Sequence, residues 1–425
     1  MRSGPEAVVI ADDLTGAADT GVQFAALGAP VYLMPLETLW LDRPWMSEAA
    51  GISTYTSSRQ LPSRAAAERL RRVAPVLADL RPRRIYKKID SCLRGNLGAE
   101  IDVLLDLLGL DAALIAPALP AQGRITVGGV QLVRGVPLAE TEFAKDPIAP
   151  INSSVVAEIL VCQSRHPVGG IRVDEYRDPD RLEAAVQREL GRGCRLIVCD
   201  AAEQAHLDQL AGLVVRSAGR LLPVGSAGLA ASLAGQFFAD PAVAPLSVPA
   251  VDRLLLVCGT GSRVTRGQLD ILFDRYPGTR AELKPEWLIA ASPEDRHRRA
   301  GELLDAWTGG ILALTIGLLP SEGLTVTPAQ AAAGLAVLTE LASQIVRAGR
   351  ADGLFLSGGE TADAFLRASG GEAIALEQEL LPGLVLGRLL GGPANDLPVV
   401  TKAGAFGGKR TLVALYERLS AGAGS

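Results

Sequence analysis

Short apolar runs alternate along this chain with stretches of helical periodicity, and this alternation constrains the fold more than any other feature. Most of the runs are continuously apolar, as in AVVIA at 7–11, instead of alternating with polar residues. Continuous runs are typical of strands covered on both faces, as in parallel sheets. The expected strands are 7–11, 31–34, 84–87, 113–116, 196–199, 221–224, 253–258, 311–315, 353–357 and 397–401, with helices at 65–78, 182–190, 204–218 and 327–348. This βαβα order predicts an α/β fold in which mostly parallel sheets are flanked by helices.

The composition limits the number of domains and the class of partner. A chain of 425 residues, 48% of them hydrophobic and 21% charged, is long and apolar enough for two folded domains. Aromatic residues make up only 4% and the net charge is -5. Nucleic-acid binding needs a basic surface and usually stacking rings, so no nucleic-acid partner is expected.

One proline-rich segment predicts where the two domains meet. Residues 239–252 (ADPAVAPLSVPAVD) contain three spaced prolines, which remove backbone donors and fix φ. We therefore expect a semi-rigid linker at 239–252 between domains at 1–238 and 253–425; the alternative is a long surface loop within one domain. A second stretch, 123–150, is rich in glycine and proline and shows no clear period, so we expect an irregular segment there, long enough to be functional.

Two segments of the first half combine a strand end with charged side chains. Asp12 and Asp13 follow the run at 7–11, where carboxylates can orient a hydroxyl for attack on phosphorus. Helix capping by Asp13 or Thr15 is the alternative interpretation of this segment. The second segment, 87–96 (KKIDSCLRGN), offers donors suited to a small acid that carries hydroxyls. These donors are Lys88, Ser91, Arg94 and Asn96. A turn at 225–228 (GSAG) could bind an anion or simply allow close packing.

Three glycine-rich segments follow strands of the second half. They are 258–262 (CGTGS), 357–361 (SGGET) and 402–408 (KAGAFGG). Backbone amides of such turns and of helix N-termini bind phosphates without side-chain charge. Neither Walker A spacing nor GxGxxG occurs, which counts against P-loop enzymes and dinucleotide dehydrogenases.

The remaining patterns concern the compartment and metals. The cysteines at 92, 162, 194, 199 and 258 show no pairing pattern, which favours a reducing compartment. The apolar stretch near the start is too short for a signal peptide, and no run is long enough to span a membrane. We therefore expect a cytoplasmic protein without a membrane partner, and a homodimer by default. No zinc-like spacing appears, and the metal ligands remain unknown from the sequence.

Several of these segments together resemble the four-carbon acid sugar kinases. The resemblance covers nearly the whole chain. It is carried by IADDLTGAADTG at 10–21, KKIDSCLRGNLGAEI at 87–101, PALPAQGRITVGGVQLV at 117–133, TEFAKDPIAPI at 141–151, VGSAGLAASLA at 224–234, SGGETADAF at 357–365 and TKAGAFGG at 401–408.

The resemblance implies an N-terminal acid-sugar domain and a C-terminal nucleotide domain. It implies ATP-dependent phosphorylation of the terminal hydroxyl of threonate, erythronate or 3-oxo-tetronate. For such a reaction we expect Mg²⁺ on the phosphates and an active site in the cleft between the domains. The ATP contacts implied by motif match are Ser262, Gly358, Gly359, Glu360, Thr361 and Gly404. Asp12 or Asp13 would then be the catalytic carboxylate. A dehydrogenase and a two-domain small-acid binding protein without turnover remain the alternatives.

Overall fold

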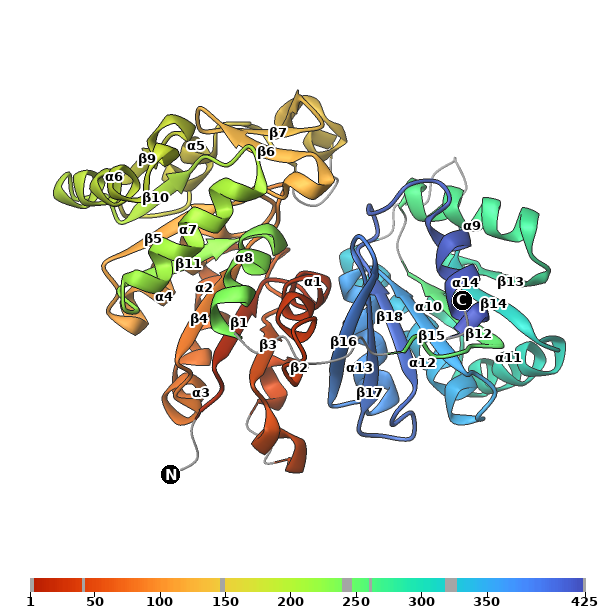
Figure 1. Cartoon of the computed structure of the whole chain (residues 1–425). Helices are drawn as coiled ribbons and strands as arrows, with labels where there is room; N and C mark the ends of the chain where they lie inside the picture. Colours follow the sequence, from red (N-terminus) through yellow and green to blue (C-terminus); the bar gives the residue numbers. More distant parts are fainter. Residues whose placement is uncertain are drawn as a thin grey trace. The chain divides into compact units, whose positions relative to one another are not determined.

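The chain forms two compact units, Met1–Val243 and Ala244–Ser425. The computed structural model describes residues 4–39, 43–145, 150–238, 247–259, 262–317 and 327–422. In Figure 1 the N-terminal unit runs from red to green and the C-terminal unit from green to blue. Each unit contains a mostly parallel sheet flanked by helices, which confirms the predicted fold class.

The sheet of the N-terminal unit has the order β2-β3-β1-β4-β11-β5-β10-β9, and every described pairing in it is parallel. Its strands are β1 (Ala7–Ala11), β2 (Val31–Pro35), β3 (Gly51–Tyr55), β4 (Arg84–Lys88), β5 (Ala112–Ala116), β9 (Val168–Ile171), β10 (Leu196–Cys199) and β11 (Leu221–Gly225). The central strands β1 and β5 are buried along their whole length, as their continuous apolar sequences require.

Helices cover both faces of this sheet. They are α1 (Leu14–Ala25), α2 (Ser63–Arg71), α3 (Val73–Leu80), α4 (Leu97–Leu108), α5 (Val156–Val161), α6 (Pro179–Gly191), α7 (Gln204–Arg216) and α8 (Ala227–Phe237). Helix α8 packs against α1 and α7, while α2 packs against α4. After β1 the chain adds strands toward one edge of the sheet, and after β4 it adds them toward the other edge. Because crossovers between parallel strands are right-handed, helices in the two directions lie on opposite faces.

The segment at 123–150 is more regular than the sequence suggests. It contains a small antiparallel sheet of β6 (Arg124–Val127), β7 (Val130–Val133) and β8 (Val136–Pro137). Asp200 closes the turn between β6 and β7 by accepting hydrogen bonds from the N–H groups of Gly128 at 2.7 Å and Gly129 at 2.8 Å. The prediction of an irregular segment was therefore wrong for residues 124–137.

The sheet of the C-terminal unit has the order β13-β14-β12-β15-β18-β17-β16. Its strands are β12 (Arg253–Cys258), β13 (Gly278–Leu283), β14 (Gly310–Ile316), β15 (Gly353–Ser357), β16 (Ala373–Leu381), β17 (Leu384–Leu390) and β18 (Pro398–Lys402). The strands from β13 to β18 in this order pair in parallel, whereas β17 pairs antiparallel with both β18 and β16.

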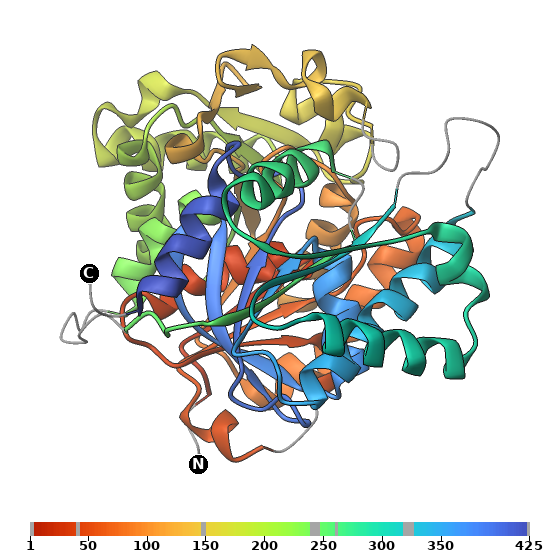
Figure 2. The ribbon, with the colours of Figure 1, turned by 90° about the vertical axis from the view of Figure 1, so that its right-hand side faces the viewer.

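Two groups of helices cover this second sheet. They are α9 (Arg263–Arg275), α10 (Pro285–Ala290), α11 (Pro293–Ala306), α12 (Pro328–Arg347), α13 (Gly359–Ser369) and α14 (Thr411–Ala421). Helix α12 packs against α10, α11 and α13, and α9 packs against α14, which is dark blue beside green α9 in Figure 2. By length and composition α12 could cross a membrane, but half of its most apolar window is buried inside the unit, as in a core helix of a globular protein.

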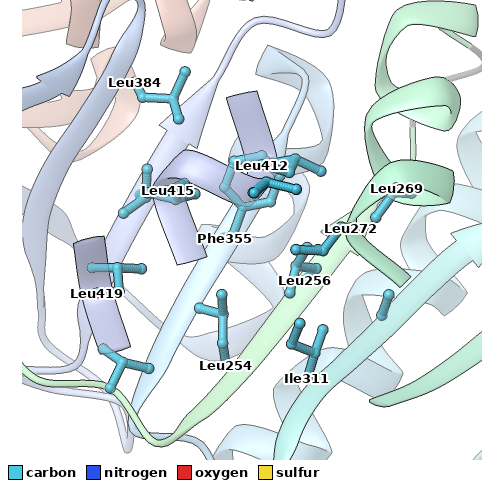
Figure 3. Close-up of a cluster of buried hydrophobic side chains, with 14 of the residues drawn as sticks. Leu254, Leu256, Leu269, Leu272, Ile311, Phe355, Leu384, Leu412, Leu415 and Leu419 are labelled. Carbon is cyan, nitrogen blue, oxygen red and sulfur yellow. The ribbon is translucent and has the colours of Figure 1, made fainter. Parts of the chain in front are cut away.

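One layer of the core of the C-terminal unit lies between its sheet and the pair α9 and α14 (Figure 3). Leu254, Leu256 and Phe355 project from the strands toward Leu272 of α9 and Leu415 of α14, and all five are buried. Burying a leucine or phenylalanine side chain contributes about 1.5–3 kcal/mol, so this layer fixes the positions of the strand ends.

Most of the predicted elements are confirmed within one or two residues. One exception is the helix at 65–78, which is divided into α2 and α3. Pro75 explains the break, because its ring clashes with the carbonyl of Arg71, the last residue of α2. Of the predicted linker, residues 239–246 lie outside the described residues, and 247–252 form neither helix nor strand.

Each sheet has a topological switch point, on either side of which the chain adds strands in opposite directions. In the N-terminal unit this point lies between β1 and β4, and in the C-terminal unit it lies between β12 and β15. Ligands of open α/β sheets bind outside the carboxyl ends of strands at such points. The topology therefore predicts ligand sites at the residues that follow these four strands.

Candidate functional site

Charged side chains gather at the carboxyl ends of β3, β1 and β4 in the N-terminal unit. These strands are neighbours, with Ala11 paired to Tyr55 and Ile10 paired to Lys87. Asp12 and Asp13 follow β1, Arg59 follows β3, and Lys88 is the last residue of β4. The structure thus brings together the predicted Asp12, Asp13 and Lys88, and adds Arg59.

Arg59 is hydrogen-bonded to both aspartates. Its Nε and Nη2 donate to Asp12 Oδ2 at 2.6 Å and Oδ1 at 2.8 Å. Its Nη1 and Nη2 donate to Asp13 Oδ2 at 2.9 Å and Oδ1 at 2.8 Å. Paired N–H···O bonds of this kind fix both the distance and the plane of a carboxylate. The two adjacent aspartates are therefore held in one orientation by a single guanidinium.

The charges of this cluster keep Asp12 and Arg59 ionised. Burial alone would raise the pKa of Asp12, but Arg59, Lys87 and Lys88 together lower it below its usual value. Burial likewise opposes the charge of Arg59, yet Asp12, Asp13 and Asp90 raise its pKa well above normal. Asp12 is therefore a carboxylate at neutral pH, able to accept a hydrogen bond from a substrate hydroxyl.

Asp13 and Asp12 have different surroundings. Asp13 is the N-cap of α1, where it accepts hydrogen bonds from the N–H of Gly16 at 2.9 Å and the hydroxyl of Thr15 at 2.8 Å. Together with Arg59, these donors give each Asp13 oxygen two hydrogen bonds. Asp12 accepts only from Arg59 among the side chains and amides described, and so has acceptor capacity left. This geometry confirms the alternative interpretation of Asp13 as a helix cap.

The backbone at Gly95 passes close to the carboxylate of Asp12. Gly95 has a φ of +97°, which favours glycine, and a Cβ built there would lie 3.0 Å from Asp12 Oδ2. Only a residue without a side chain lets the chain pass so close to the carboxylate.

Lys88 places a second cation next to the aspartates. The residue is only 4% exposed. A Cβ built on Gly16 would lie 2.9 Å from Lys88 Nζ and 2.6 Å from Asp13 Oδ1, so the two side chains meet at this glycine. Within the described ranges Lys88 forms no hydrogen bond or ion pair, although its charge acts on Asp12 and Asp90. An ammonium in this position is suited to bind an anionic ligand.

The loop after β4 holds a second group of charges. Arg94 forms an ion pair with Asp90, with Nε 2.7 Å from Oδ2. Burial opposes the charge of Asp90, but Arg94 and Arg59 lower its pKa far below normal. The hydroxyl of Ser91 accepts a hydrogen bond from Arg124, and Phe143 lies under both guanidinium groups, 5.5 Å from Arg94 and 5.9 Å from Arg124. The guanidinium groups of Arg94 and Arg124 therefore share one aromatic ring, and Ser91 contacts the second of them.

Asn96, the other predicted donor, is used inside the protein. Its Nδ2 donates to the carbonyls of Ser58 at 3.1 Å and Leu61 at 2.9 Å, and its Oδ1 accepts from Ser63 at 2.9 Å. These bonds fix the segment that carries Arg59. The structure thus gives Asn96 a positioning role, and its contact with the substrate stays a prediction.

A buried ion pair stabilises the same segment, which carries Arg59. Lys87 Nζ lies 2.6 Å from Glu100 Oε2, and the two side chains are 1% and 2% exposed. The other Glu100 oxygen accepts from the hydroxyl of Ser58, which also contacts Thr56 at 2.7 Å. This chain of contacts connects α4 to the residues just before Arg59.

Replacing Glu100 with glutamine is expected to lower the free energy of unfolding by about 3–5 kcal/mol, because Lys87 then remains as a buried charge without its partner. Urea unfolding at neutral pH measures the change. Glu68→Gln is the matched control, since Glu68 forms an exposed ion pair with Arg71 and its side chain is 64% exposed; a change within about 0.5 kcal/mol is expected there. Equal effects of the two substitutions would contradict the structural role of the Lys87–Glu100 pair.

In the C-terminal unit, the glycine-rich segments lie at the ends of adjacent strands. Cys258 of β12 pairs with Ser357 of β15, which pairs with Lys402 of β18. Residues 260 and 261 of the first segment lie outside the described residues, whereas the segments after β15 and β18 are described. Gly358, Gly359, Glu360 and Thr361 form the start of α13, with Gly358 as its N-cap.

Several contacts hold these strand ends together. Ser262 and Thr265 both donate to the carbonyl of Gly404, at 2.8 and 2.9 Å. Gly358 has a φ of +101° and donates its N–H to the carbonyl of Lys402 at 2.8 Å, so the turn before α13 needs glycine. The structure therefore brings Ser262, Gly404 and the start of α13 to one edge of the sheet.

A cavity of about 330 Å³ opens next to the loop after β18. Its lining residues are Leu381, Pro382, Gly407, Gly408, Arg410, Thr411 and Ala414. Most of these groups are apolar or glycine, and the volume is within the range of small-molecule sites.

Comparisons with known proteins agree with this division of the chain. Residues 7–233 match the family described as "Sugar-binding N-terminal domain", and residues 255–412 match "Nucleotide-binding C-terminal domain". The chain is 34% identical to a D-threonate kinase of Salmonella typhimurium, over 96% of this chain and 97% of that protein. This chain belongs to the four-carbon acid sugar kinase family. The enzyme is a sugar-acid kinase.

Other relatives of the kinase carry different substrate names. A D-erythronate kinase of Heliobacterium modesticaldum is 32% identical over 94% of both chains. A 3-oxo-tetronate kinase of Brucella melitensis is 26% identical over 96% of this chain and 93% of its own. Crystal structures of proteins from Salmonella typhimurium LT2 and Haemophilus influenzae have the same fold, with TM-scores of 0.78 and 0.71 at 22% and 21% identity, over 96% and 97% of this chain and 98% and 100% of theirs.

Sequence reasoning missed several residues of the kinase's candidate site. Arg59, Asp90 and Arg124 were not selected, although Asp90 and Arg124 lie within the quoted motifs. Arg59 follows β3, whose sequence GISTY is too polar for a continuous apolar run, so the strand end was not recognised. The turn at 225–228 is a packing turn, because a Cβ on Gly225 or Gly228 would lie 2.7 Å from a carbonyl oxygen.

Proposed function

We propose that this kinase transfers the γ-phosphoryl group of ATP to the terminal hydroxyl of a four-carbon acid sugar and so forms the 4-phosphate. Candidate acids are threonate, erythronate and 3-oxo-tetronate, the acids named for its relatives. The observation that carries the proposal is the charge cluster after β3, β1 and β4, where an ionised carboxylate lies beside lysine and arginine donors.

In this proposal the N-terminal unit, residues 1–238, binds the acid sugar. Asp12 accepts the hydrogen bond of the terminal hydroxyl and orients it, because its carboxylate still has acceptor capacity. Lys88, Arg94 and Ser91 bind the substrate carboxylate and the remaining hydroxyls. Arg59, Asp13 and Asn96 hold these groups in place, so that catalysis consists mainly of positioning and charge stabilisation.

The C-terminal unit, residues 253–425, binds the nucleotide, with residues 239–252 as the linker. The N-terminal turn of α13, which contains Gly359, Glu360 and Thr361, offers amide donors and the positive end of a helix to phosphate. Gly358, Gly404 and Ser262 shape the neighbouring turns. The adjoining cavity has the size and apolar walls that a purine base requires.

Mg²⁺ on the phosphates is part of the proposal, but the chain itself supplies no evident site for it. Among the residues that the structure describes, no group of three histidine, cysteine or acidic side chains is placed to bind a metal ion. Asp12, Asp13 and Asp90 are all held by arginines. The ion would then be bound by phosphate oxygens and water, as is common for Mg²⁺, and no step above depends on it.

The location in the cell and the assembly remain proposals as well. We propose a cytoplasmic enzyme, consistent with five free cysteines, four of them buried. A homodimer is proposed only as the commonest assembly of soluble enzymes.

The proposed reaction is tested with a panel of four- and five-carbon sugar acids, offered with ATP and Mg²⁺. ADP release is followed in a coupled assay, and phosphorus NMR locates the new phosphate. We expect turnover with at least one four-carbon acid, phosphate on its terminal oxygen, and much lower kcat/KM for five-carbon acids. Binding of the acids without ADP release, or turnover only with five-carbon acids, would overturn the proposal.

A further inference from the structure

Lys402 is a buried cation beneath the loop that follows β18. The residue is 0% exposed. Its Nζ contacts Thr265 Oγ1 at 3.2 Å and the carbonyl oxygens of Ala403 at 3.0 Å, Gly404 at 3.2 Å and Phe406 at 3.2 Å. In the ranges described, no carboxylate lies within ion-pair distance of it. Buried charges in proteins are normally paired, whereas this ammonium is held by three backbone carbonyls and one hydroxyl, all of them uncharged.

The contacts of Lys402 set the direction of the peptide groups in this loop. In a trans peptide the N–H points opposite to the carbonyl. The three carbonyls that contact Lys402 share their peptide groups with the N–H groups of Gly404, Ala405 and Gly407. None of these three N–H groups donates a hydrogen bond in the described part of the chain. Ala405 and Gly407 are exposed and Gly404 is partly exposed. Accessible backbone donors above a buried cation form a concave site for an anion.

Gln268 and Thr265 of α9 fix the same loop from the side. Gln268 Nε2 donates to the carbonyls of Phe406 at 3.1 Å and Gly408 at 2.9 Å, and Thr265 donates to Gly404 at 2.9 Å. The carbonyls of Ala403, Gly404, Phe406 and Gly408 therefore all accept hydrogen bonds from Lys402, Thr265 or Gln268. The shape of the loop is built into the unit before any ligand arrives.

We propose that Lys402 is a positioning residue for the nucleotide: it holds the loop 403–406 by its carbonyls, the outward amides bind phosphate oxygens, and the bound phosphates keep the ammonium protonated. The inference rests on the proposed function, in which the C-terminal unit binds ATP. It adds that nucleotide binding takes up a proton in alkaline solution.

The surroundings of Lys402 determine whether nucleotide binding strengthens or weakens as the pH rises. Burial lowers the pKa of its ammonium to about 8. The titratable group that acts on it is Cys258 of β12, whose own pKa burial raises to about 12, above the range of the experiment. Ser357 of β15 and Thr265 of α9 are uncharged, and Arg266, Arg280 and Glu282 line the small cavity that Cys258 and Thr265 share. A polyanion bound above Lys402 raises its pKa, so binding weakens as pH rises above 8.

Calorimetry with ADP, without an acid sugar, tests this between about pH 7 and 9.5 in two buffers of different ionisation enthalpy. For the wild type we expect a Kd that is constant up to about pH 8 and then rises up to about tenfold per pH unit, with uptake of about one proton. Lys402→Arg keeps its charge throughout this range, and so should remove both the pH dependence and the proton uptake. Lys402→Met should bind ADP at least about tenfold more weakly at pH 7, without a slope.

Lys409→Met is the matched control, because it removes an exposed lysine charge from the same loop and should leave the slope and proton uptake intact. A wild type that takes up no proton above pH 8, or a Lys402→Arg variant with an unchanged slope, overturns the role of Lys402. If the methionine variant unfolds, the wild-type and arginine profiles still decide. If ADP does not bind the wild type at any pH, the proposed function itself fails.

Discussion

Replacing Asp12 with asparagine is expected to lower kcat/KM for the acid sugar by about 10²–10⁴-fold, the effect typical of losing a positioned catalytic carboxylate. Asp12 is buried, ionised and oriented by two hydrogen bonds from Arg59, and it alone of the pair has free acceptor capacity. Asparagine has nearly the same shape but loses the charge and one acceptor oxygen. Steady-state kinetics with ATP saturating measures the loss, and thermal unfolding confirms that the variant is folded.

Asp13→Asn is the matched variant, one residue away in the same cluster. Asparagine caps helices about as well as aspartate, so α1 should keep its N-terminal cap. We expect a loss of kcat/KM at least about tenfold smaller than for Asp12→Asn. A larger loss at Asp13 would make it the carboxylate that orients the hydroxyl, and nearly normal activity in both variants would remove the cluster from catalysis.

Replacing Gly359 with valine is expected to weaken ADP binding about 100-fold, because the new side chain occupies the space where phosphate approaches the first turn of α13. Gly359 is the first residue of α13, where valine can adopt the backbone conformation. Calorimetry measures the Kd for ADP. In kinetics, KM for ATP should rise while KM for the acid sugar stays close to that of the wild type.

Gly301→Val provides the control for Gly359→Val. Gly301 lies within α11, and a Cβ built there meets nothing within 4 Å. The control should bind ADP like the wild type. If both valine variants bind ADP normally, the nucleotide does not use the start of α13, and the proposed contacts in the C-terminal unit are wrong.

Several parallel strands were predictable because they are apolar along nearly their whole length. The runs at 7–11, 253–258 and 353–357 match β1, β12 and β15 to the residue. Since ligand sites of such sheets lie after strand ends, the positions of Asp12, Lys88 and the glycine-rich turns followed directly. For these residues the local sequence was enough to predict their position at a strand end.

Other parts could not be predicted because their stability depends on distant contacts. Strand β3 contains Ser53, whose hydroxyl donates to the carbonyl of Ala17 in α1 at 2.7 Å, so a polar residue is satisfied inside the core. The β16–β17 hairpin pairs antiparallel beside a parallel sheet, and its register has irregularities that no local pattern indicates. The role of Lys402 depends on α9 and the loop after β18, which lie far apart in the sequence.

Hydrogen–deuterium exchange of the full chain, with an acid sugar alone and with ADP alone, tests the central claim most directly. The substrate found in the activity panel should slow exchange at 12–16, 56–59 and 87–96, and ADP should slow it at 357–362 and 402–408. Each ligand should leave the other set unchanged. Protection of the same unit by both ligands, or protection by ADP of the N-terminal segments instead, would contradict the assignment of acid sugar and nucleotide to separate units.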